Sequence, residues 1–480
     1  MKVVLCALNG SWSHSCLALR CLRPGLEKAG FEVVLKEYTL RDRDSHVLED
    51  LVKEKADIYG FSCYIWNITQ MENLSRALHQ VLPSSHIILG GPEVSFATER
   101  FAAWSWVETV VSGEGETAVV EVCSAIQKGI PLSAVTLATP AKEMPQNGIL
   151  YRDGENTGGI LYYESSRGCP FGCAYCLSST EKGVRQKTPE ETLADLRAFE
   201  TLNSPCKIVK FVDRTFNADK KRAKAIWEAL LSEEFTKHYH FEICVSLLDE
   251  ESFSILSRFP SGKIQLEIGL QSTHQPTLDA CARHLDPKKV IAATKRIYEM
   301  GNIHVHLDLI AGLPYESYER FARSFDEAYG VSHMLQLGFL KLLHGTFLRD
   351  NADQFGYVYL KTPPYTVLKT NWISYEELQK LSHIAEVLER YLESGRFVHA
   401  LWYVTPFLHS PFRFWEGYTE YLEKVDPRPL QRISQKDAYR YFYDYLSCTL
   451  PIDQTALKTA LGADYRENEN KQEPSFLRIY

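Results

Sequence analysis

The segment Arg167-Gly-Cys-Pro-Phe-Gly-Cys-Ala-Tyr-Cys176 carries the most specific signal in this 480-residue chain. Its three cysteines, Cys169, Cys173 and Cys176, lie within eight residues. Three thiolates on one short loop can hold three irons of a cubane iron–sulfur cluster, although most such clusters take four cysteine ligands. No fourth cysteine lies close by, so one iron would stay open to an outside ligand. A structural zinc ion would need a fourth Cys or His nearby, and the next cysteine is Cys206.

Short apolar runs alternate with amphipathic helical stretches around this segment. The strand candidates are 161–166, 208–213, 241–246, 264–270, 304–310 and 335–343. Strand–helix repeats without a hairpin signal predict a parallel sheet curled into an incomplete (β/α)6 barrel of the TIM type, here over 161–345. Chemistry in such barrels sits at the carboxyl ends of the strands, and the cysteine segment directly follows the first strand.

The first 140 residues predict a separate α/β domain. Five β-branched runs, at 3–8, 31–38, 57–65, 86–90 and 107–112, alternate with helical stretches. This order predicts a doubly wound, Rossmann-like sheet that binds ligands at the carboxyl ends of its strands. Glycines in those loops let the backbone approach a ligand closely. A stretch rich in Pro, Gly and Asn, 141–160, is expected to be a linker.

Residues 346–480 lose the strand rhythm and predict a mainly helical domain. Aromatic residues are concentrated over 401–446. We interpret them as a compact aromatic core. The alternative is a substrate lid or a stacking surface for bases, because four arginines are interleaved with them; these are Arg413, Arg428, Arg432 and Arg440. From about Asp464 onward we expect a loose polar tail.

Composition and charge exclude several classes of protein. Hydrophobic residues make up 45% and charged residues 24% of the chain, as in an ordinary folded protein. The net charge of −8 gives no global signal for nucleic-acid binding. No apolar run is long enough to cross a bilayer, and the N-terminus is typical of a first strand rather than a signal peptide. We expect a cytoplasmic monomer without a membrane span.

The cysteine spacing, with Tyr175 before the third cysteine, resembles the signature of the radical S-adenosylmethionine (SAM) superfamily over about 160–345. The resemblance implies that the three cysteines are catalytic and hold a [4Fe–4S] cluster. Its open iron would chelate SAM, which one electron from a donor such as flavodoxin or ferredoxin cleaves to a 5′-deoxyadenosyl radical. The implied SAM-binding residues are Tyr175, Glu242, Gln271, Asp308, Ile310 and Gly312.

Residue chemistry agrees with these implied roles. A carboxylate, Glu242, suits the amino group of SAM, whereas Gln271 and Asp308 suit the ribose hydroxyls. The backbone from Ile310 to Gly312 would lie near the adenine. The dipeptide Asp213-Arg214 departs from the glycine-rich second-strand motif of many relatives, which leaves a contact to the amino group there in question.

An α/β domain in front of such a barrel resembles the cobalamin-binding class of the superfamily. The implied cobalamin-binding residues are Asn9, Ser62, Trp66, Asn67, Gly90, Gly91, Glu93, Gly113 and Gly115. The Asp-x-His-x-x-Gly motif that supplies a lower axial histidine in many cobalamin mutases is absent. His14 lies on the first loop, but a polar loop histidine more often forms hydrogen bonds than binds cobalt. The C-terminal region resembles a tail domain found in one subgroup of the class.

The commonest reaction of this class is methylation of an unactivated carbon or phosphorus centre, and it is our leading hypothesis. The alternative is a reductive or rearranging modification, such as the reduction of epoxyqueuosine to queuosine in tRNA. A basic run beside the cysteines, Lys182, Arg185 and Lys187, would suit RNA. A non-catalytic cobalamin or redox sensor has little use for the SAM-contacting residues. The substrate, a small molecule or tRNA, stays open.

Overall fold

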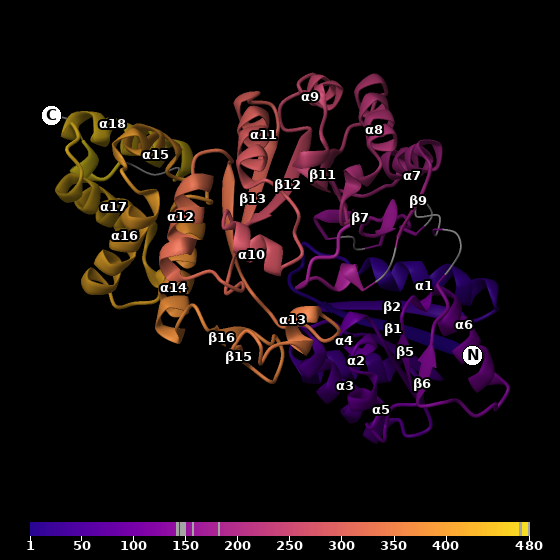
Figure 1. The fold of residues 1–480 in the computed structure, drawn as a ribbon. Helices are drawn as coiled ribbons and strands as arrows, with labels where there is room; N and C mark the ends of the chain where they lie inside the picture. Colours follow the sequence, from indigo (N-terminus) through magenta and orange to yellow (C-terminus); the bar gives the residue numbers. More distant parts are fainter. Residues whose placement is uncertain (141–143, 145–149, 156–157, 181–182, 470–472, 479–480) are drawn as a thin grey trace.

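The computed structural model describes residues 1–140, 144, 150–155, 158–180, 183–469 and 473–478. Figure 1 shows an N-terminal sheet domain (indigo), a second sheet with helices on its outer side, and a helical C-terminal region (yellow). The predicted linker 141–160 lies partly outside the described residues. Among the described residues, no helix is both long and apolar enough to cross a membrane.

The N-terminal sheet is parallel and six-stranded, in the order β2-β1-β3-β4-β5-β6. Its strands are β1 (Lys2–Asn9), β2 (Glu32–Thr39), β3 (Ile58–Ser62), β4 (His86–Gly90), β5 (Thr109–Ser112) and β6 (Val135–Leu137). Its helices are α1 (Leu17–Lys28), α2 (Asp44–Glu54), α3 (Ile68–Val81), α4 (Pro92–Ser95), α5 (Thr98–Ala102) and α6 (Gly115–Gln127). Separate apolar cores form under α2 and α3 and under α1 and α6, which confirms the doubly wound fold. The short sixth strand, β6, was not predicted.

The second sheet is also parallel, in the order β14-β13-β12-β11-β10-β7. Its strands are β7 (Ile160–Tyr163), β10 (Ile208–Phe211), β11 (His238–Ile243), β12 (Ile264–Gln271), β13 (His304–Ala311) and β14 (Met334–Phe339). The helices are α7 (Pro189–Thr201), α8 (Lys220–Ser232), α9 (Glu250–Leu256), α10 (Gln275–Ala280), α11 (Pro287–Glu299) and α12 (Tyr318–Ala328). Because β7 and β14 do not pair with each other, the barrel is open, as predicted.

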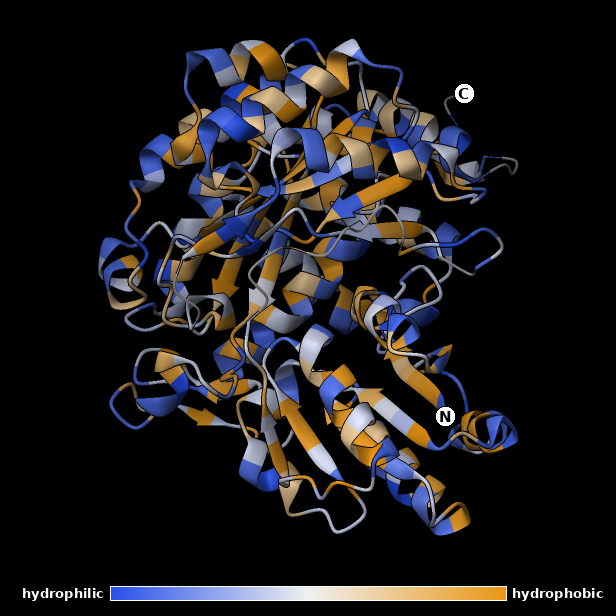
Figure 2. Cartoon of the chain, turned by 90° about the vertical axis from the view of Figure 1, so that its right-hand side faces the viewer, coloured by the Kyte–Doolittle hydropathy of each residue, from blue (hydrophilic) through white to orange (hydrophobic). Residues whose placement is uncertain are grey.

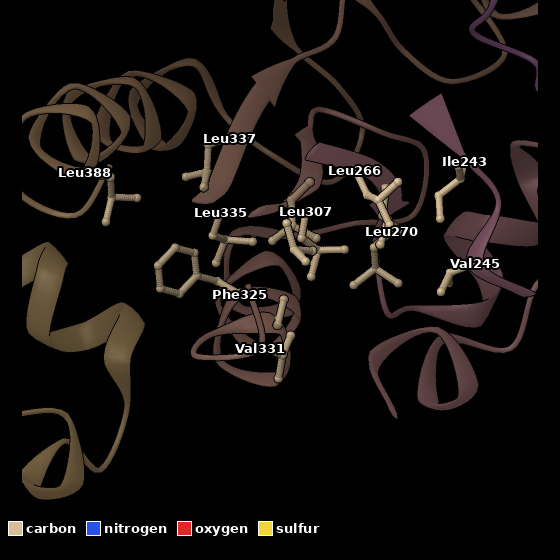
Figure 3. Close-up of a cluster of buried hydrophobic side chains, with 14 of the residues drawn as sticks. Ile243, Val245, Leu266, Leu270, Leu307, Phe325, Val331, Leu335, Leu337 and Leu388 are labelled. Carbon is tan, nitrogen blue, oxygen red and sulfur yellow. The ribbon is translucent and has the colours of Figure 1, made fainter. Parts of the chain in front are cut away.

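The two faces of the second sheet differ in chemistry. Along β12 and β13, buried apolar residues alternate with partly exposed ones. Figure 3 shows Leu307 and Leu335 packed toward Phe325 of α12, and Figure 2 shows hydrophobic residues concentrated on the strands. The alternate positions, such as Glu267 and Asp308, face the other side. The face away from the helices is therefore polar.

A short antiparallel hairpin encloses the cysteine segment. It pairs β8 (Ser166–Gly168) with β9 (Val184–Gln186), and Arg167 lies opposite Arg185. The sequence contained no hairpin signal here, because each strand has only three residues. The hairpin holds both ends of the cysteine loop together.

The C-terminal region is mainly helical, as predicted. It contains α13 (Phe347–Asp350), a small hairpin of β15 (Val358–Tyr359) and β16 (Val367–Lys369), and then α14 (Tyr375–Tyr391), α15 (Val398–Val404), α16 (Pro411–Val425), α17 (Gln435–Thr449) and α18 (Gln454–Asn468). Trp415, Tyr418 and Phe442 are completely buried and pack together, so the aromatic-core interpretation is confirmed for them. The region docks on α12, where Asp326 accepts hydrogen bonds from Ser410 (2.6 Å) and the Phe412 amide (2.7 Å).

The expectation of a loose tail from Asp464 is wrong. Helix α18 continues to Asn468, and Asp464 is buried. Its carboxylate accepts hydrogen bonds from the amides of His399 (2.8 Å) and Ala400 (2.9 Å), in the first turn of α15. A polar residue that satisfies helix N-terminal amides belongs to the packed structure.

Gly91 is required by the close approach of two loops. Its φ is +111°, and a Cβ atom there would lie 2.5 Å from the carbonyl oxygen of Cys63. We expect Gly91→Ala to lower the free energy of unfolding by more than about 2 kcal/mol, since both backbone strain and a clash oppose it. Gly129→Ala is the control, because Gly129 also has a positive φ (+66°) but nothing within 4 Å. Equal thermal unfolding midpoints for the two variants would contradict this explanation.

Candidate functional site

The cysteine loop is held in place by main-chain hydrogen bonds to distant segments. The Ala174 amide donates to the Cys281 carbonyl (2.9 Å), and the Leu348 amide donates to the Ala174 carbonyl (3.0 Å). Cys173 is buried, whereas Cys169 and Cys176 are partly exposed. The loop therefore lies between the end of α10 and the start of α13, with Cys169 and Cys176 partly accessible.

Asp213 supports the strand that leads into this loop. Its carboxylate is fully buried and accepts hydrogen bonds from the Ser165 amide (2.8 Å), the Ser165 hydroxyl (2.5 Å) and the Ser166 hydroxyl (2.7 Å). The departure of Asp213-Arg214 from the glycine-rich motif thus has a structural use. The neighbouring Thr215 hydroxyl lies 3.5 Å from the Cys169 sulfur.

The donor chemistry of the loop fits an iron–sulfur cluster. Among the residues that the structure describes, no three His, Cys, Asp or Glu side chains stand in a metal-binding arrangement, the three thiols included. The fit therefore depends on three sulfur donors on one short loop. The guanidinium of Arg283 lies 3.4 Å from the Cys173 sulfur and 3.3 Å from the Tyr175 hydroxyl. Arg283 therefore links the cysteine loop to the segment that follows α10.

Three predicted SAM-binding residues lie on the polar face, at the carboxyl ends of neighbouring strands. Glu242 on β11 stands opposite Glu267 on β12, and Asp308 on β13 stands opposite Gly269 on β12. Gln271 ends β12 after a bulge, with a φ of +72°. The Oε1 atom of Gln271 and the Oδ1 atom of Asp308 are buried without a hydrogen-bond partner in the described structure. Orphaned acceptors fit a ligand that brings hydroxyl donors, as a ribose does.

Two carboxyl groups of this face, those of Asp308 and Glu242, have raised pKa values. Burial, then the charges of Glu267 and Glu242, raise the pKa of Asp308 to about 8. Burial likewise raises the pKa of Glu242 to about 7, against the opposing charge of Arg214. Because positive charge stabilises ionised carboxylates, a cationic ligand such as SAM suits this site.

A third carboxyl group of this polar face, that of Glu267, lies beside two basic side chains. Glu267 Oε2 lies 2.9 Å from His240 Nε2 and 3.3 Å from Lys210 Nζ. Burial alone would raise the pKa of Glu267, but the hydrogen bond with His240 and the charges of Lys210 and His240 lower it to about 2. The site thus combines one carboxyl group with a lowered pKa, that of Glu267, with two whose pKa values are raised, those of Glu242 and Asp308.

The remaining predicted SAM-binding residues surround this face. Tyr175 is mostly buried beside Arg283. Ile310 is partly exposed and follows Asp308 on the same face of β13. Gly312 has a φ of +90°, and its carbonyl accepts a hydrogen bond from Tyr357 (3.1 Å).

The predicted cobalamin-binding residues gather at the carboxyl edge of the N-terminal sheet. Asn9, Ser62 and Gly90 end β1, β3 and β4, Gly91 and Gly113 follow β4 and β5, and Gly115 begins α6. Trp66 is half exposed and stacks on Tyr64, with ring centroids 4.4 Å apart. Parallel strands place all these loops at one edge.

Several of these side chains form contacts within the protein, Asn67, Glu93 and Asn9 among them. Asn67 is buried and donates to the carbonyls of Leu8 (3.2 Å) and Ser62 (3.0 Å). Glu93 is buried and accepts a hydrogen bond from Tyr365 of the C-terminal region. Asn9 donates to Glu37 (2.8 Å). These contacts brace the loops at the carboxyl edge of the sheet.

A cavity of about 540 Å³ lies beside the first of these loops. It is lined by residues of β2 together with Asn9, Trp12, His14 and Arg20. The His14 Nδ1 atom lies 2.5 Å from the hydroxyl of Tyr162 on β7, which ties this loop to the barrel. The cavity therefore lies beside β2 of the N-terminal sheet, and no described residue of the cysteine loop lines it.

Sequence reasoning did not identify Arg283. It quoted Arg167 in the cysteine segment, Arg185 in the basic run and Asp213 as a departure from the glycine-rich motif, but it assigned none of them a supporting role around the cysteine loop. The role of Arg283 depends on α10 returning to the cysteine loop, which no local pattern reports.

The raised pKa of Asp308 predicts a pH-dependent effect of its removal. The unfolded chain loses this proton near pH 4 and the folded protein near pH 8, so Asp308 destabilises the fold progressively between these values. We expect Asp308→Asn to raise the free energy of unfolding at pH 8 by on the order of 1 kcal/mol or more and to change it little at pH 4. Thermal unfolding without ligands measures this, with the exposed Asp353→Asn as control. An equal effect at both pH values would contradict it.

Three families match consecutive parts of the chain. They are the B12 binding domain over 11–123, the Radical SAM superfamily over 163–328, and the family described as protein of unknown function (DUF4080) over 353–479. The matches follow the order of the N-terminal sheet, the open barrel and the helical region.

Two curated proteins and one solved structure are similar to this chain. The uncharacterized methyltransferase PH0819 of Pyrococcus horikoshii is 24% identical over 316 residues, which cover 59% of this chain and 68% of that protein. The 2-(S-pantetheinyl)-carbapenam-3-carboxylate methyltransferase of Streptantibioticus cattleyicolor is 26% identical over 333 residues, which cover 61% of this chain and 47% of that protein. The structure of the cobalamin-dependent S-adenosylmethionine radical enzyme OxsB, with aqua-cobalamin and S-adenosylmethionine bound, has a TM-score of 0.65 at 14% identity and covers 98% of this chain and 79% of that chain.

The OxsB structure shows that the two chains share a fold. The family matches locate a B12 binding domain and a radical SAM domain in this chain. The chain therefore belongs to the radical SAM superfamily and carries a B12 binding domain in front of its radical SAM domain.

Proposed function

We propose that this protein is a cobalamin-dependent radical SAM methyltransferase that acts on an unactivated carbon or phosphorus centre. The observation that carries the proposal is the contact between the two cofactor edges. Arg167, two residues before Cys169, forms ion pairs with Glu114 (2.9 Å) and Glu116 (2.8 Å) on the loop of the B12 binding domain. Both curated relatives described above are named methyltransferases, which supports this reaction.

The proposed roles follow from the chemistry of the residues. When bound, the [4Fe–4S] cluster and SAM would supply a 5′-deoxyadenosyl radical, and cobalamin would supply a methyl group. Cys169, Cys173 and Cys176 would hold the cluster, with the guanidinium of Arg283 beside the Cys173 sulfur. Gln271 and Asp308 would accept hydrogen bonds from the ribose, and Glu242 would receive the amino group.

The proposal includes the predicted division of the chain. A cobalamin-binding domain, 1–140, and a radical SAM barrel, 161–345, would be joined by 141–160, and 346–480 would close the site from the side of α12. We further propose a flavodoxin or ferredoxin as electron donor, a monomeric state and a cytoplasmic location. The substrate class is open between a metabolite, a lipid and a peptide.

The reductive modification of tRNA is not favoured. The curated relatives described above are named methyltransferases, and neither name contains a reductive reaction. Of the basic run, Lys187 is buried and pairs with Asp195 (2.5 Å), and Arg185 pairs with Glu114. Lys182 lies outside the described residues. These two cations are therefore used within the protein.

We expect Cys176→Ala to leave the protein folded but without cluster absorption and without 5′-deoxyadenosine formation. The thiol is partly exposed, so its removal costs little packing, whereas two sulfurs cannot hold the cluster. Iron content, the visible spectrum and chromatography of SAM products measure this. The exposed Cys448→Ala is the matched control. Full iron content in the Cys176 variant would contradict the assignment.

We expect bound cobalamin to be in the base-off state without a protein imidazole below the cobalt. The mutase motif is absent, and His14 already contacts Tyr162. The optical spectrum of the loaded protein distinguishes the states, and His14→Gln should leave it unchanged. A base-on spectrum, or one that changes in the His14 variant, would contradict this.

Methyl transfer itself is tested with SAM labelled with deuterium in its methyl group. The reconstituted protein, with its cobalamin reduced to cob(I)alamin by a low-potential chemical reductant, should form labelled methylcobalamin and S-adenosylhomocysteine. Mass spectrometry detects both without knowledge of the substrate. A protein that only reduces or rearranges its substrate would cleave SAM without labelling cobalamin. Nucleoside profiles of tRNA from a deletion strain then test the alternative directly.

A further inference from the structure

Arg167 stands between the two cofactor-binding edges. It lies at the centre of β8, which leads into the cysteine loop. Its guanidinium pairs with Glu164 (2.5 Å) of its own segment and with Glu114 (2.9 Å) and Glu116 (2.8 Å) of the B12 binding domain. One guanidinium thus joins three carboxylates from two domains.

The second strand of the hairpin adds a parallel contact. Arg185 is the cross-strand partner of Arg167 and also binds Glu114, with an Nη1–Oε2 distance of 3.1 Å. Two like charges directly opposite each other repel. Glu114, whose side chain is only 8% exposed, lies between them and offsets this repulsion. We call these five residues (Glu114, Glu116, Glu164, Arg167 and Arg185) the interdomain ion cluster.

Burial and geometry make this cluster more rigid than ordinary surface pairs. The Arg167 side chain is 15% exposed, and those of Glu164 and Glu116 are 16% and 19% exposed. Charges so far removed from water interact strongly and lose much when one partner is removed. The fork of a guanidinium also fixes direction, which a lysine cannot reproduce.

We propose that Arg167 is a positioning residue that locks the loop of the B12 binding domain, 113–116, against the cysteine loop. Its function would be to set the separation of the two cofactors. Its side chain contacts the loop 113–116 directly, and its backbone lies two residues before Cys169. The role in cofactor separation rests on the proposed function, whereas the locking of the two loops does not depend on it.

The first test uses the protein without cofactors. In Arg167→Gln we expect amide hydrogen exchange over 113–118 to become at least about tenfold faster, and exchange in β12 and β13 to stay unchanged. Arg167→Lys should restore part of the protection. Arg197→Gln is the matched control, because it removes an exposed ion pair with Glu233 (2.7 Å) inside the barrel domain. Unchanged exchange over 113–118 in Arg167→Gln would overturn the proposal.

The second test uses the reconstituted holoenzyme. Pulsed electron paramagnetic resonance between cob(II)alamin and the reduced cluster should give a broader distance distribution in Arg167→Gln than in the parent or the Arg197→Gln control. An unchanged distribution would overturn the role in cofactor separation. If the protein binds no cobalamin, the proposed function fails while the exchange result still decides the locking.

A third variant covers the case in which Arg167→Gln does not fold. Glu116→Gln removes one of the three partners of Arg167 and leaves Glu114 and Glu164 in place. We expect a smaller acceleration of exchange over 113–118, about twofold to fivefold. The same exchange as in the parent would count against the proposal.

Discussion

Parallel pairing brings all strand ends of a sheet to one edge, and this chain turns two such edges toward each other. Several contacts hold them, including three that involve loops at the carboxyl edge of the first sheet. Arg167 reaches Glu114 and Glu116, His14 reaches Tyr162, and Tyr365 of the C-terminal region reaches Glu93. In Figure 1 the hairpin of β15 and β16 and the helix α13 lie beside α4, where this third contact forms. Each contact joins a loop of the first sheet to a segment in or near the barrel, so tertiary contacts hold the predicted cofactor loops against the barrel.

The polar inner face of the barrel follows from the same constraint. A closed barrel fills its interior with apolar layers, but this open one keeps Glu242, Glu267 and Asp308 on the side away from the helices. One of them, Glu267, is ionised because His240 and Lys210 face it. The other two hold their protons more tightly because they share a buried space with it. Burial of these carboxyl groups therefore costs stability when they ionise, and a cationic ligand would offset that cost.

The sequence predicted the features that depend on local pattern. The β-branched runs located the strands of both sheets, and the cysteine spacing identified the radical SAM domain. It did not predict the hairpin of β8 and β9, whose strands are too short to show alternation. It also placed Asp464 in a tail, because a polar residue near a chain end resembles a solvated one. Only the packing of α18 against the first turn of α15 reveals that this carboxylate caps helix amides.

The sequence by itself determined the donor set, since three thiols within eight residues specify a metal chemistry wherever the loop lies. It also determined the order of the domains, because strand and helix periodicities are local properties. Tertiary structure alone decided which side chains surround those thiols and which loops face them. Arg283 contacts Cys173, and Arg167 contacts Glu114 and Glu116, across long separations in the chain. Only the folded structure brings these groups together. Such pairing is a property of three-dimensional distance and burial, which no spacing along the chain encodes.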